Sequence, residues 1–185
     1  MIIDGMNLKG KIMGLKVGTV KIEKYNLNWK KMFDDEKERL ETIFGDIAIE
    51  IEHVGSTSIE GLSAKPIIDI AVGLNSLADF EKVKYYFENE LYSIKSDSVK
   101  DEILVRKGRE ENRTHFIHIM ELNSQRYKDT IIFRDYLKKH KDVLKKYEEL
   151  KKDLAIKYAN NREMYSASKN DFIKEVIKKA YKENL

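Results

Sequence analysis

The chain has 185 residues, 42% of them hydrophobic and 36% charged, which fits one domain with an ordinary core and a densely charged surface. Its 35 basic and 32 acidic residues nearly cancel to a formal net charge of +3, so composition gives no indication of a nucleic-acid or membrane surface. The absence of cysteine excludes disulfides, thiolate metal sites and a cysteine nucleophile, and it fits the cytoplasmic location that we expect.

Residues 1–16 are expected to be a loose N-terminal extension of a single domain that spans 17–185. The extension contains three glycines and no clear periodicity, and it lacks the long apolar core of a signal peptide. No apolar run in the chain approaches the roughly 18 residues that a transmembrane helix requires, so no such helix is expected.

The next part of the chain predicts a strand, a helix and a second strand. Residues 17–23 are short, alternating and β-branched, which is typical of a strand. Asn28 is expected to cap a helix that has Trp29 on its apolar face and ends at Gly45. Residues 47–52 alternate isoleucine with alanine and glutamate, which predicts a half-buried strand.

A nearly unbroken apolar run at 67–74 predicts a central strand that carries one charge, Asp69. Before it, residues 57–64 are expected to form a short helix that Pro66 closes off. The remaining expected elements are, in chain order, a helix over 77–90, strands over 91–98, 102–107 and 114–121, and a helical C-terminal hairpin over 125–184 that is broken at Asn160-Asn161.

The glycine and hydroxyl residues after the second strand predict a phosphate-binding turn. Gly55 lets the backbone turn sharply and approach a ligand closely. The N-terminus of the short helix that follows would present N–H groups to an anion. Ser56, Thr57 and Ser58 add hydroxyl groups that can hold a phosphate or a metal-bound water. The alternative is a structural turn without a ligand.

Asp69 is the candidate metal ligand, because an unpaired charge in a buried strand is costly. On a strand it shares one face with Ala71 and Gly73, so the face beside the carboxylate is small and open. The alternative is a buried carboxylate that is paired with Lys65 or Arg134.

A family resemblance rests mainly on residues 53–70. They read His53-Val54-Gly55-Ser56-Thr57-Ser58, Gly61-Leu62 and Ala64-Lys65-Pro66-Ile67-Ile68-Asp69-Ile70, which closely resembles the signature of the GrpB-like family of the nucleotidyltransferase superfamily. Less specific matches are Trp29, Phe33, His115-x-x-His118, Phe133-Arg134-Asp135-Tyr136-Leu137, Tyr165, Lys169 and Phe172. The resemblance covers roughly residues 17–182. It implies an α/β (α+β) fold, a small mixed sheet of the nucleotidyltransferase type flanked by helices.

In that superfamily the Gly-Ser turn takes the phosphates of a nucleotide and strand carboxylates hold Mg²⁺. The resemblance therefore implies a metal-dependent nucleotidyl or phosphoryl transferase that acts on a small molecule, with Mg²⁺ or Mn²⁺ as cofactor and a nucleoside triphosphate as substrate. The residues expected to bind phosphate are Gly55, Ser56, Thr57, Ser58, Lys65 and Arg134. Those expected in catalysis are Asp69, His118 and Glu121, and those expected to hold the metal are Asp69 and His115.

The chain departs from the superfamily pattern at Ala71, which stands where a second carboxylate belongs. Candidates for the third carboxylate are Glu121 and Glu102. A histidine ligand beside Asp69 would suit Mn²⁺ or Zn²⁺ better than Mg²⁺. Because losing a bridging carboxylate should damage two-metal catalysis, the alternative is a non-catalytic module that binds a nucleotide or a coenzyme A derivative.

A small-molecule nucleotide is the expected partner and no membrane is expected, whereas the sequence leaves open whether the chain has a protein partner. In some proteins a domain similar to this family is fused to dephospho-coenzyme A kinase, which points to nucleotide or coenzyme A metabolism. The near-neutral charge argues against a nucleic-acid partner. In a third interpretation the charged C-terminal helices bind a protein, and mutating Asp69 would then change only stability.

Overall fold

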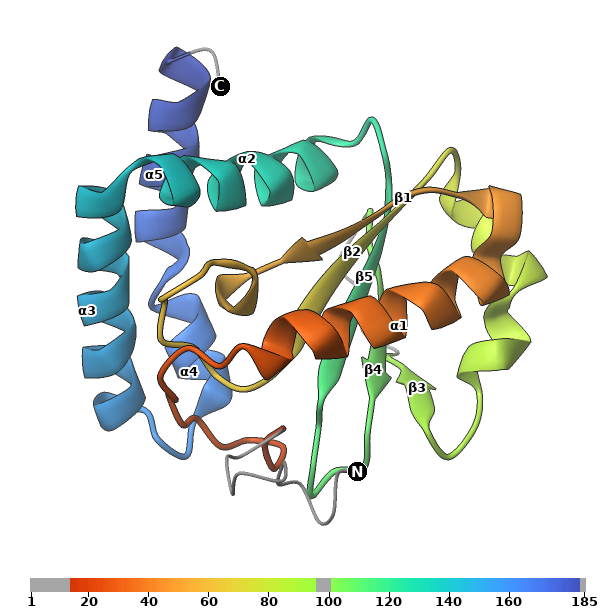
Figure 1. Ribbon diagram of the computed structural model, residues 1–185, viewed down its shortest axis with the longest axis horizontal. Coiled ribbons are helices and arrows are strands. Elements are labelled where there is room, and N and C mark those ends of the chain that lie inside the picture. Colours follow the sequence, from red (N-terminus) through yellow and green to blue (C-terminus); the bar gives the residue numbers. More distant parts are fainter. Residues whose placement is uncertain (1–13, 96–100, 184–185) are drawn as a thin grey trace.

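The computed structural model describes residues 14–95 and 101–183, which form a mixed sheet flanked by helices (Figure 1). The five strands lie in the order β1-β2-β5-β4-β3. Only β2 and β5 are parallel, and the other neighbours are antiparallel. The strands are β1 (Ala48–Val54), β2 (Ile68–Leu74), β3 (Tyr92–Ile94), β4 (Ile103–Lys107) and β5 (His115–Glu121).

Helix α1 (Asn28–Phe44) covers one face of the sheet. Its buried side includes Trp29 and Leu40, as the apolar spacing predicts. This side packs on the alternate residues of β2 that begin with Ile68 and form the main core. Asn28 is the first helical residue rather than the cap, and the side chain of Asn26 accepts its backbone N–H at 3.1 Å.

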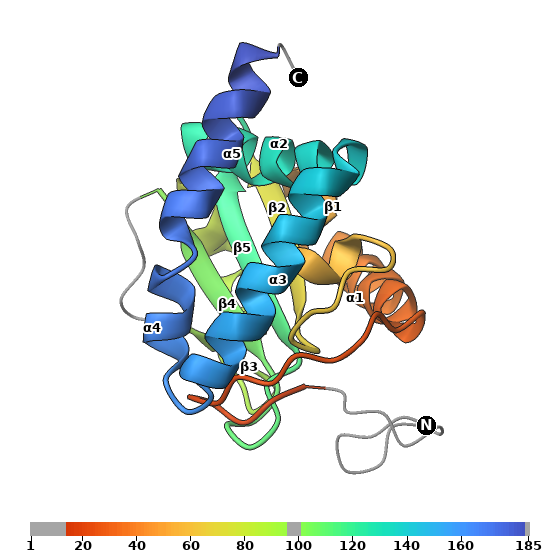
Figure 2. The same ribbon diagram turned by 90° about the vertical axis from the view of Figure 1, so that its left-hand side faces the viewer.

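The C-terminal helices lie on the other side of the sheet (Figure 2), and the first of them packs directly on β1, β2 and β5. Packing on this side joins Ala71 of β2 and Met120 of β5 to Tyr127. The expected break at Asn160-Asn161 is confirmed, and further breaks occur at His140 and Lys169. The helices are α2 (Gln125–Lys139), α3 (Lys141–Lys157), α4 (Arg162–Ala167) and α5 (Asn170–Lys182).

The strand predicted at 17–23 is wrong. Its only bridge in the described chain is a single pair between Glu23 and Ala64. Gly18, at φ +84°, turns the chain within the segment. The backbone N–H groups go to separate segments instead of one partner strand: Val17 donates to Glu110, Val20 to Ala159 and Glu23 to Ala64.

Two predicted helices are also wrong. Residues 77–90 form two short 3₁₀ helices, Leu77–Lys82 and Lys84–Phe87, because the β-branched and aromatic residues from Val83 onward favour helix weakly. Residues 57–64 hold only the end of a 3₁₀ turn, η2 (Ser56–Ser58), and a turn at Gly61. The strand predicted over 91–98 is β3, and its residues 96–98 lie outside the described residues.

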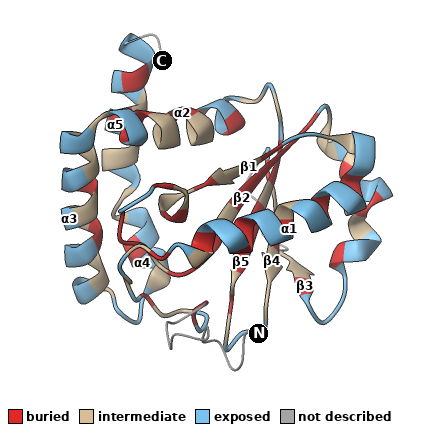
Figure 3. Ribbon diagram, viewed as in Figure 1, coloured by how far each residue is buried: buried red, intermediate tan, exposed pale blue. Residues whose placement is uncertain are grey.

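Among the strands, burial is concentrated in β2 and its parallel neighbour β5 (Figure 3). Of the predicted extension, residues 1–13 lie outside the described residues. Residues 14–16 are tied to the domain, because Leu15 is buried against Ile67 and Phe116. In the described ranges, no helix has the length and apolarity that crossing a membrane requires.

Candidate functional site

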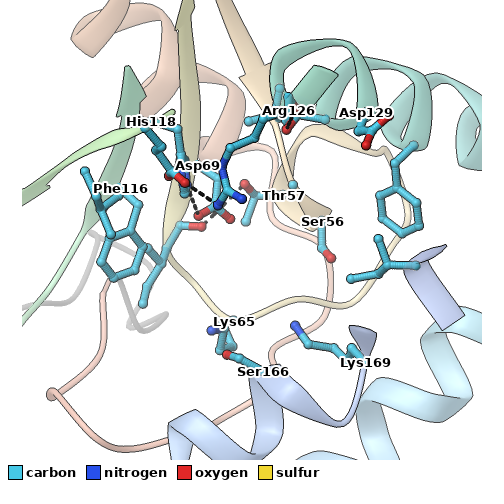
Figure 4. A pocket seen from close by; sticks show the side chains of 18 of the residues that line it. Ser56, Thr57, Lys65, Asp69, Phe116, His118, Arg126, Asp129, Ser166 and Lys169 are labelled. Atoms are coloured by element: carbon cyan, nitrogen blue, oxygen red, sulfur yellow. Dashed lines mark hydrogen bonds and ion pairs between the residues drawn. The ribbon is translucent and has the colours of Figure 1, made fainter. Parts of the chain in front are cut away.

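A cavity of about 690 Å³ lies between the sheet and the C-terminal helices (Figure 4). Its wall includes the η2 turn, the sides of β2 and β5 that face the C-terminal helices, and parts of α2, α4 and α5. The volume is within the range of pockets that hold small molecules and cofactors.

Gly55 and Asp69 meet at the mouth of the turn, as their spacing predicts. Gly55 has φ +67° and ψ −174°, a backbone region that is essentially restricted to glycine. A Cβ atom there would lie 2.5 Å from Oδ2 of Asp69. Glycine is therefore required for the turn to approach the carboxylate.

Of the three hydroxyl residues expected to bind phosphate, Ser56 is the one whose side chain lines the cavity without bonding within its own turn or to a neighbouring strand, and this side chain is hydrogen-bonded to Tyr147 of α3. Thr57 also lines the cavity, but its hydroxyl lies 3.0 Å from Nε2 of His53 and within 3.5 Å of the Ile67 carbonyl. Ser58 donates to the Gly55 carbonyl at 2.6 Å and stabilises the turn itself. The expected N-terminal helix site is also missing, because η2 is a single turn.

A chain of alternating charges starts at Asp69 and crosses the wall of the cavity. Nε2 of His118, on β5, lies 3.5 Å from Oδ1 of Asp69. Nδ1 of His118 is hydrogen-bonded to Glu102, whose side chain is 4% exposed. The other oxygen of Glu102 forms an ion pair with Arg126 in the first turn of α2. Figure 4 shows Asp69, His118 and Arg126 converging on one side of the cavity.

The charges in this row of side chains, from Asp69 to Arg126, stabilise one another. Burial disfavours the charged form of His118, but its bonds to Asp69 and Glu102 outweigh burial and raise its pKa to about 9. Burial likewise opposes ionisation of both carboxyl groups, and the bonds to His118 nevertheless lower the pKa of each. At neutral pH the histidine is therefore charged between two carboxylates.

The structure does not bring His115 or Glu121 to Asp69, and both expectations are corrected. Both residues point to the α1 face of β5, because side chains alternate along a strand. Burial lowers the pKa of His115 to about 4, and the charged group with the largest effect on it is Glu36 of α1. Glu121 is exposed at the far end of β5, where it accepts the Leu77 N–H.

Arg134 is likewise absent from the cavity wall and is occupied elsewhere. Its guanidinium donates to Asp135 at 2.7 Å, to Glu52 at 2.6 Å and to the His53 carbonyl at 3.0 Å. It therefore ties α2 to β1, and the expectation that it binds phosphate is corrected.

Lys65 does line the cavity, and two cations that the residue pattern did not select lie beside it. They are Arg162 of α4 and Lys169, which caps α5. Tyr165 and Lys169 are among the less specific matches to the family, and that match gives no reason to place them near Asp69. Arg162 and Arg126 carry no local signal, since tertiary packing alone brings them to the cavity. Glu102 is one of the two candidates for the third carboxylate, and the structure places it against His118.

The donors suited to a divalent metal are Oδ1 of Asp69 and Nε2 of His118, with Glu102 holding the other ring nitrogen. This pair fits a metal that takes its remaining ligands from water or substrate oxygens. Among the described residues, no group of three or more histidine and carboxylate side chains is arranged to hold a metal. Binding would also have to displace the proton on His118.

The mixed sheet and the Gly-Ser turn beside the β2 carboxylate together define a nucleotidyltransferase-type fold. The model of the GrpB protein family matches residues 19–179. The chain is 39% identical over 175 residues to the glutamate-rich protein GrpB of Alkalihalophilus pseudofirmus, covering 90% of this chain and 98% of the relative. The chain belongs to the GrpB family.

A longer relative and a solved structure agree with this assignment. The UPF0157 protein YqkA of Bacillus subtilis is 35% identical over 84% of this chain, which spans only 45% of that relative. The crystal structure of the conserved protein GrpB from Enterococcus faecalis superposes with a TM-score of 0.81 at 31% identity. That match covers 89% of this chain and 99% of the crystallised one.

Proposed function

We propose that the chain binds a nucleoside triphosphate and, with a divalent metal, transfers its nucleotidyl or phosphoryl group to a small-molecule acceptor. Pyrophosphate leaves in the first case and the nucleoside diphosphate in the second. The observation that carries the proposal is the pair of Asp69 Oδ1 and His118 Nε2, 3.5 Å apart on the cavity wall beside the Gly-Ser turn. An oxygen and an imidazole nitrogen at one point of a cavity large enough for a small molecule are donors that Mn²⁺ accepts.

Each residue of the site has a distinct task in this proposal. Asp69 and His118 hold the metal, which when bound neutralises charge on the reacting phosphoryl group. Glu102 fixes the ring of His118, and Arg126 keeps Glu102 ionised and in place. Ser56, in the turn beside this pair, donates its hydroxyl to a phosphate oxygen.

The second candidate function is a non-catalytic module that binds a nucleotide or coenzyme A derivative in the same cavity. Two observations favour it. Ala71 leaves the metal one carboxylate short of the superfamily pattern. Charged His118 already neutralises Asp69, so the site is stable without a metal. This module would bind the same ligand class without needing Mn²⁺.

The test is thermal unfolding with nucleoside triphosphates and coenzyme A precursors, each with and without Mg²⁺ or Mn²⁺. Wild type is compared with Asp69→Asn and with Asp153→Asn, a matched change at an exposed position of α3. At 100 times its Kd, a ligand should add about 2.7 kcal/mol, or roughly 5–10 °C.

The outcomes separate the two functions. A metal-dependent shift that Asp69→Asn abolishes and Asp153→Asn keeps supports metal-dependent transfer and justifies an assay for turnover. A metal-independent shift that survives in Asp69→Asn supports the binding module. If no ligand in the panel shifts the unfolding of wild type, both candidate functions are contradicted.

A further inference from the structure

Three cationic side chains from different segments, Lys65, Arg162 and Lys169, line the cavity. Nζ of Lys65 lies 5.2 Å from the ring centroid of Tyr165, and Nζ of Lys169 lies 4.4 Å from the same centroid. Tyr165 is only 1% exposed, so it fixes both ammonium groups in place. The guanidinium of Arg162 stacks on Phe116, 4.3 Å from its ring centroid.

These cations have no carboxylate of their own. In the described ranges, none of the three forms an ion pair, whereas seven of the surface lysines pair with a carboxylate three or four residues away. Asp69 is the carboxylate that acts most strongly on Lys169 and Arg162, and it is already engaged with His118. Another lysine of the wall, Lys151, is bonded to the Ser63 carbonyl and is not part of this group.

We infer that Lys65, Arg162 and Lys169 form a subsite for a doubly charged phosphate group of the ligand, and that the anion enters together with protons. The inference deepens the proposed function, on which it rests for the class of ligand, but it requires neither a metal nor transfer. Figure 4 shows Lys65 and Lys169 directed from below toward Ser56 and Asp69. A phosphate on the subsite would therefore face the Asp69–His118 pair across the cavity.

The electrostatics of the protein without ligand explain why protons would be taken up when the anion binds. Burial and then Arg162 lower the pKa of Lys65 to about 7. Burial also lowers the pKa of Lys169 to about 8, because its effect is larger than the opposite effect of the Asp69 carboxylate, which raises the pKa. Both lysines are therefore partly neutral near pH 8, and a bound dianion would favour their charged forms.

The other charged groups around the two lysines do not remove this effect. The groups that face them are Arg162, Lys151, Asp69, Tyr165 and Tyr147. Burial raises the pKa of both tyrosines, so neither titrates near pH 8. Lys151, whose pKa burial lowers to about 7, adds to the repulsion that an anion would relieve.

The test is calorimetric titration of the full chain with sulfate and with pyrophosphate at pH 8, in EDTA and without nucleotide. Sulfate is a dianion that does not titrate in this range, so proton exchange measured with it belongs to the protein. Comparing two buffers with different ionisation enthalpies gives the number of protons. The variants are Lys169→Gln and Arg162→Gln, with Lys145→Gln on the exposed side of α3 as the matched control.

We expect both anions to bind wild type and Lys145→Gln equally well, and each site variant to bind about tenfold more weakly or worse. Sulfate binding should take up protons in wild type and fewer in Lys169→Gln. Unfolding temperatures of the free variants confirm that each one is folded. Absence of anion binding to wild type, equal affinity in all four proteins, or binding without proton uptake would each overturn the inference. Nucleotide and metal binding that persists while sulfate and pyrophosphate fail would leave the proposed function standing.

Discussion

Gly55 allows the turn and the strand carboxylate to occupy one point of the site. Its backbone conformation is one that other residues rarely adopt, and a Cβ atom would lie 2.5 Å from Asp69. Gly61, six residues later, also has a positive φ of +80°, but no atom lies within 4 Å of its Cβ position. Replacing Gly61 therefore tests backbone strain alone, whereas replacing Gly55 tests strain together with the collision with Asp69.

We expect Gly55→Ala to lower the free energy of unfolding by about 2–4 kcal/mol, because strain and collision with Asp69 add. Gly61→Ala should cost only about 1 kcal/mol, the strain of a left-handed alanine. Urea denaturation of both variants measures the two values. Equal losses would show that the approach of Gly55 to Asp69 does not contribute to the fold.

Among the elements, β4, β5 and α2 are tied together by the charges on His118, Glu102 and Arg126. The histidine takes up a proton more readily in the folded chain than in the unfolded one, because its folded pKa is about 9 and the ordinary value is 6.5. Its contribution to stability is therefore fully present below pH 6.5. It is lost as the pH rises toward 9, by up to about 3 kcal/mol.

Comparing wild type with His118→Gln isolates this contribution, because the lysines of the cavity titrate in both proteins. The difference in the free energy of unfolding should be largest at pH 6 and shrink steadily to pH 9. Urea denaturation at several pH values measures it. A difference that stays constant with pH would mean that His118 is not charged between its two carboxylates.

The elements that periodicity predicted are those whose burial follows one continuous face. The apolar run of β2 and the apolar side of α1 are examples, because each packs along its whole length on one core. The segment 17–23 failed because its backbone bonds go to three separate parts of the chain. Such bonds depend on where distant segments end, which the composition of a seven-residue stretch does not show.

At the scale of the whole molecule, the turn and Asp69 could be predicted because they are neighbours in sequence. The resemblance and the residue types also selected Lys65, His118 and Glu102, but the contacts between these residues and the rest of the site could not be predicted. Glu102 reaches His118 only because β4 pairs with β5 in the register that sets Leu104 opposite His118. Arg162 and Lys169 reach the cavity only because the C-terminal helices fold back over the sheet, an arrangement visible in Figure 2. Long-range register and helix docking have no local sequence signature.

The same arrangement makes the cavity a joint between two layers, since one wall belongs to the sheet side and the other to the C-terminal helices. A ligand that contacts both walls must suppress the opening of both. With pyrophosphate at 100 times its Kd, we expect hydrogen exchange to slow by up to about a hundredfold in residues 55–66 and 162–170. Exchange in α1, on the far face of the sheet, should not change.

Mass spectrometry of exchanged peptides measures all three segments. Slowing in only one wall would show that the anion rests on that layer alone. Slowing confined to the groove around Tyr127 and Tyr181 would place the anion at the other side of α2.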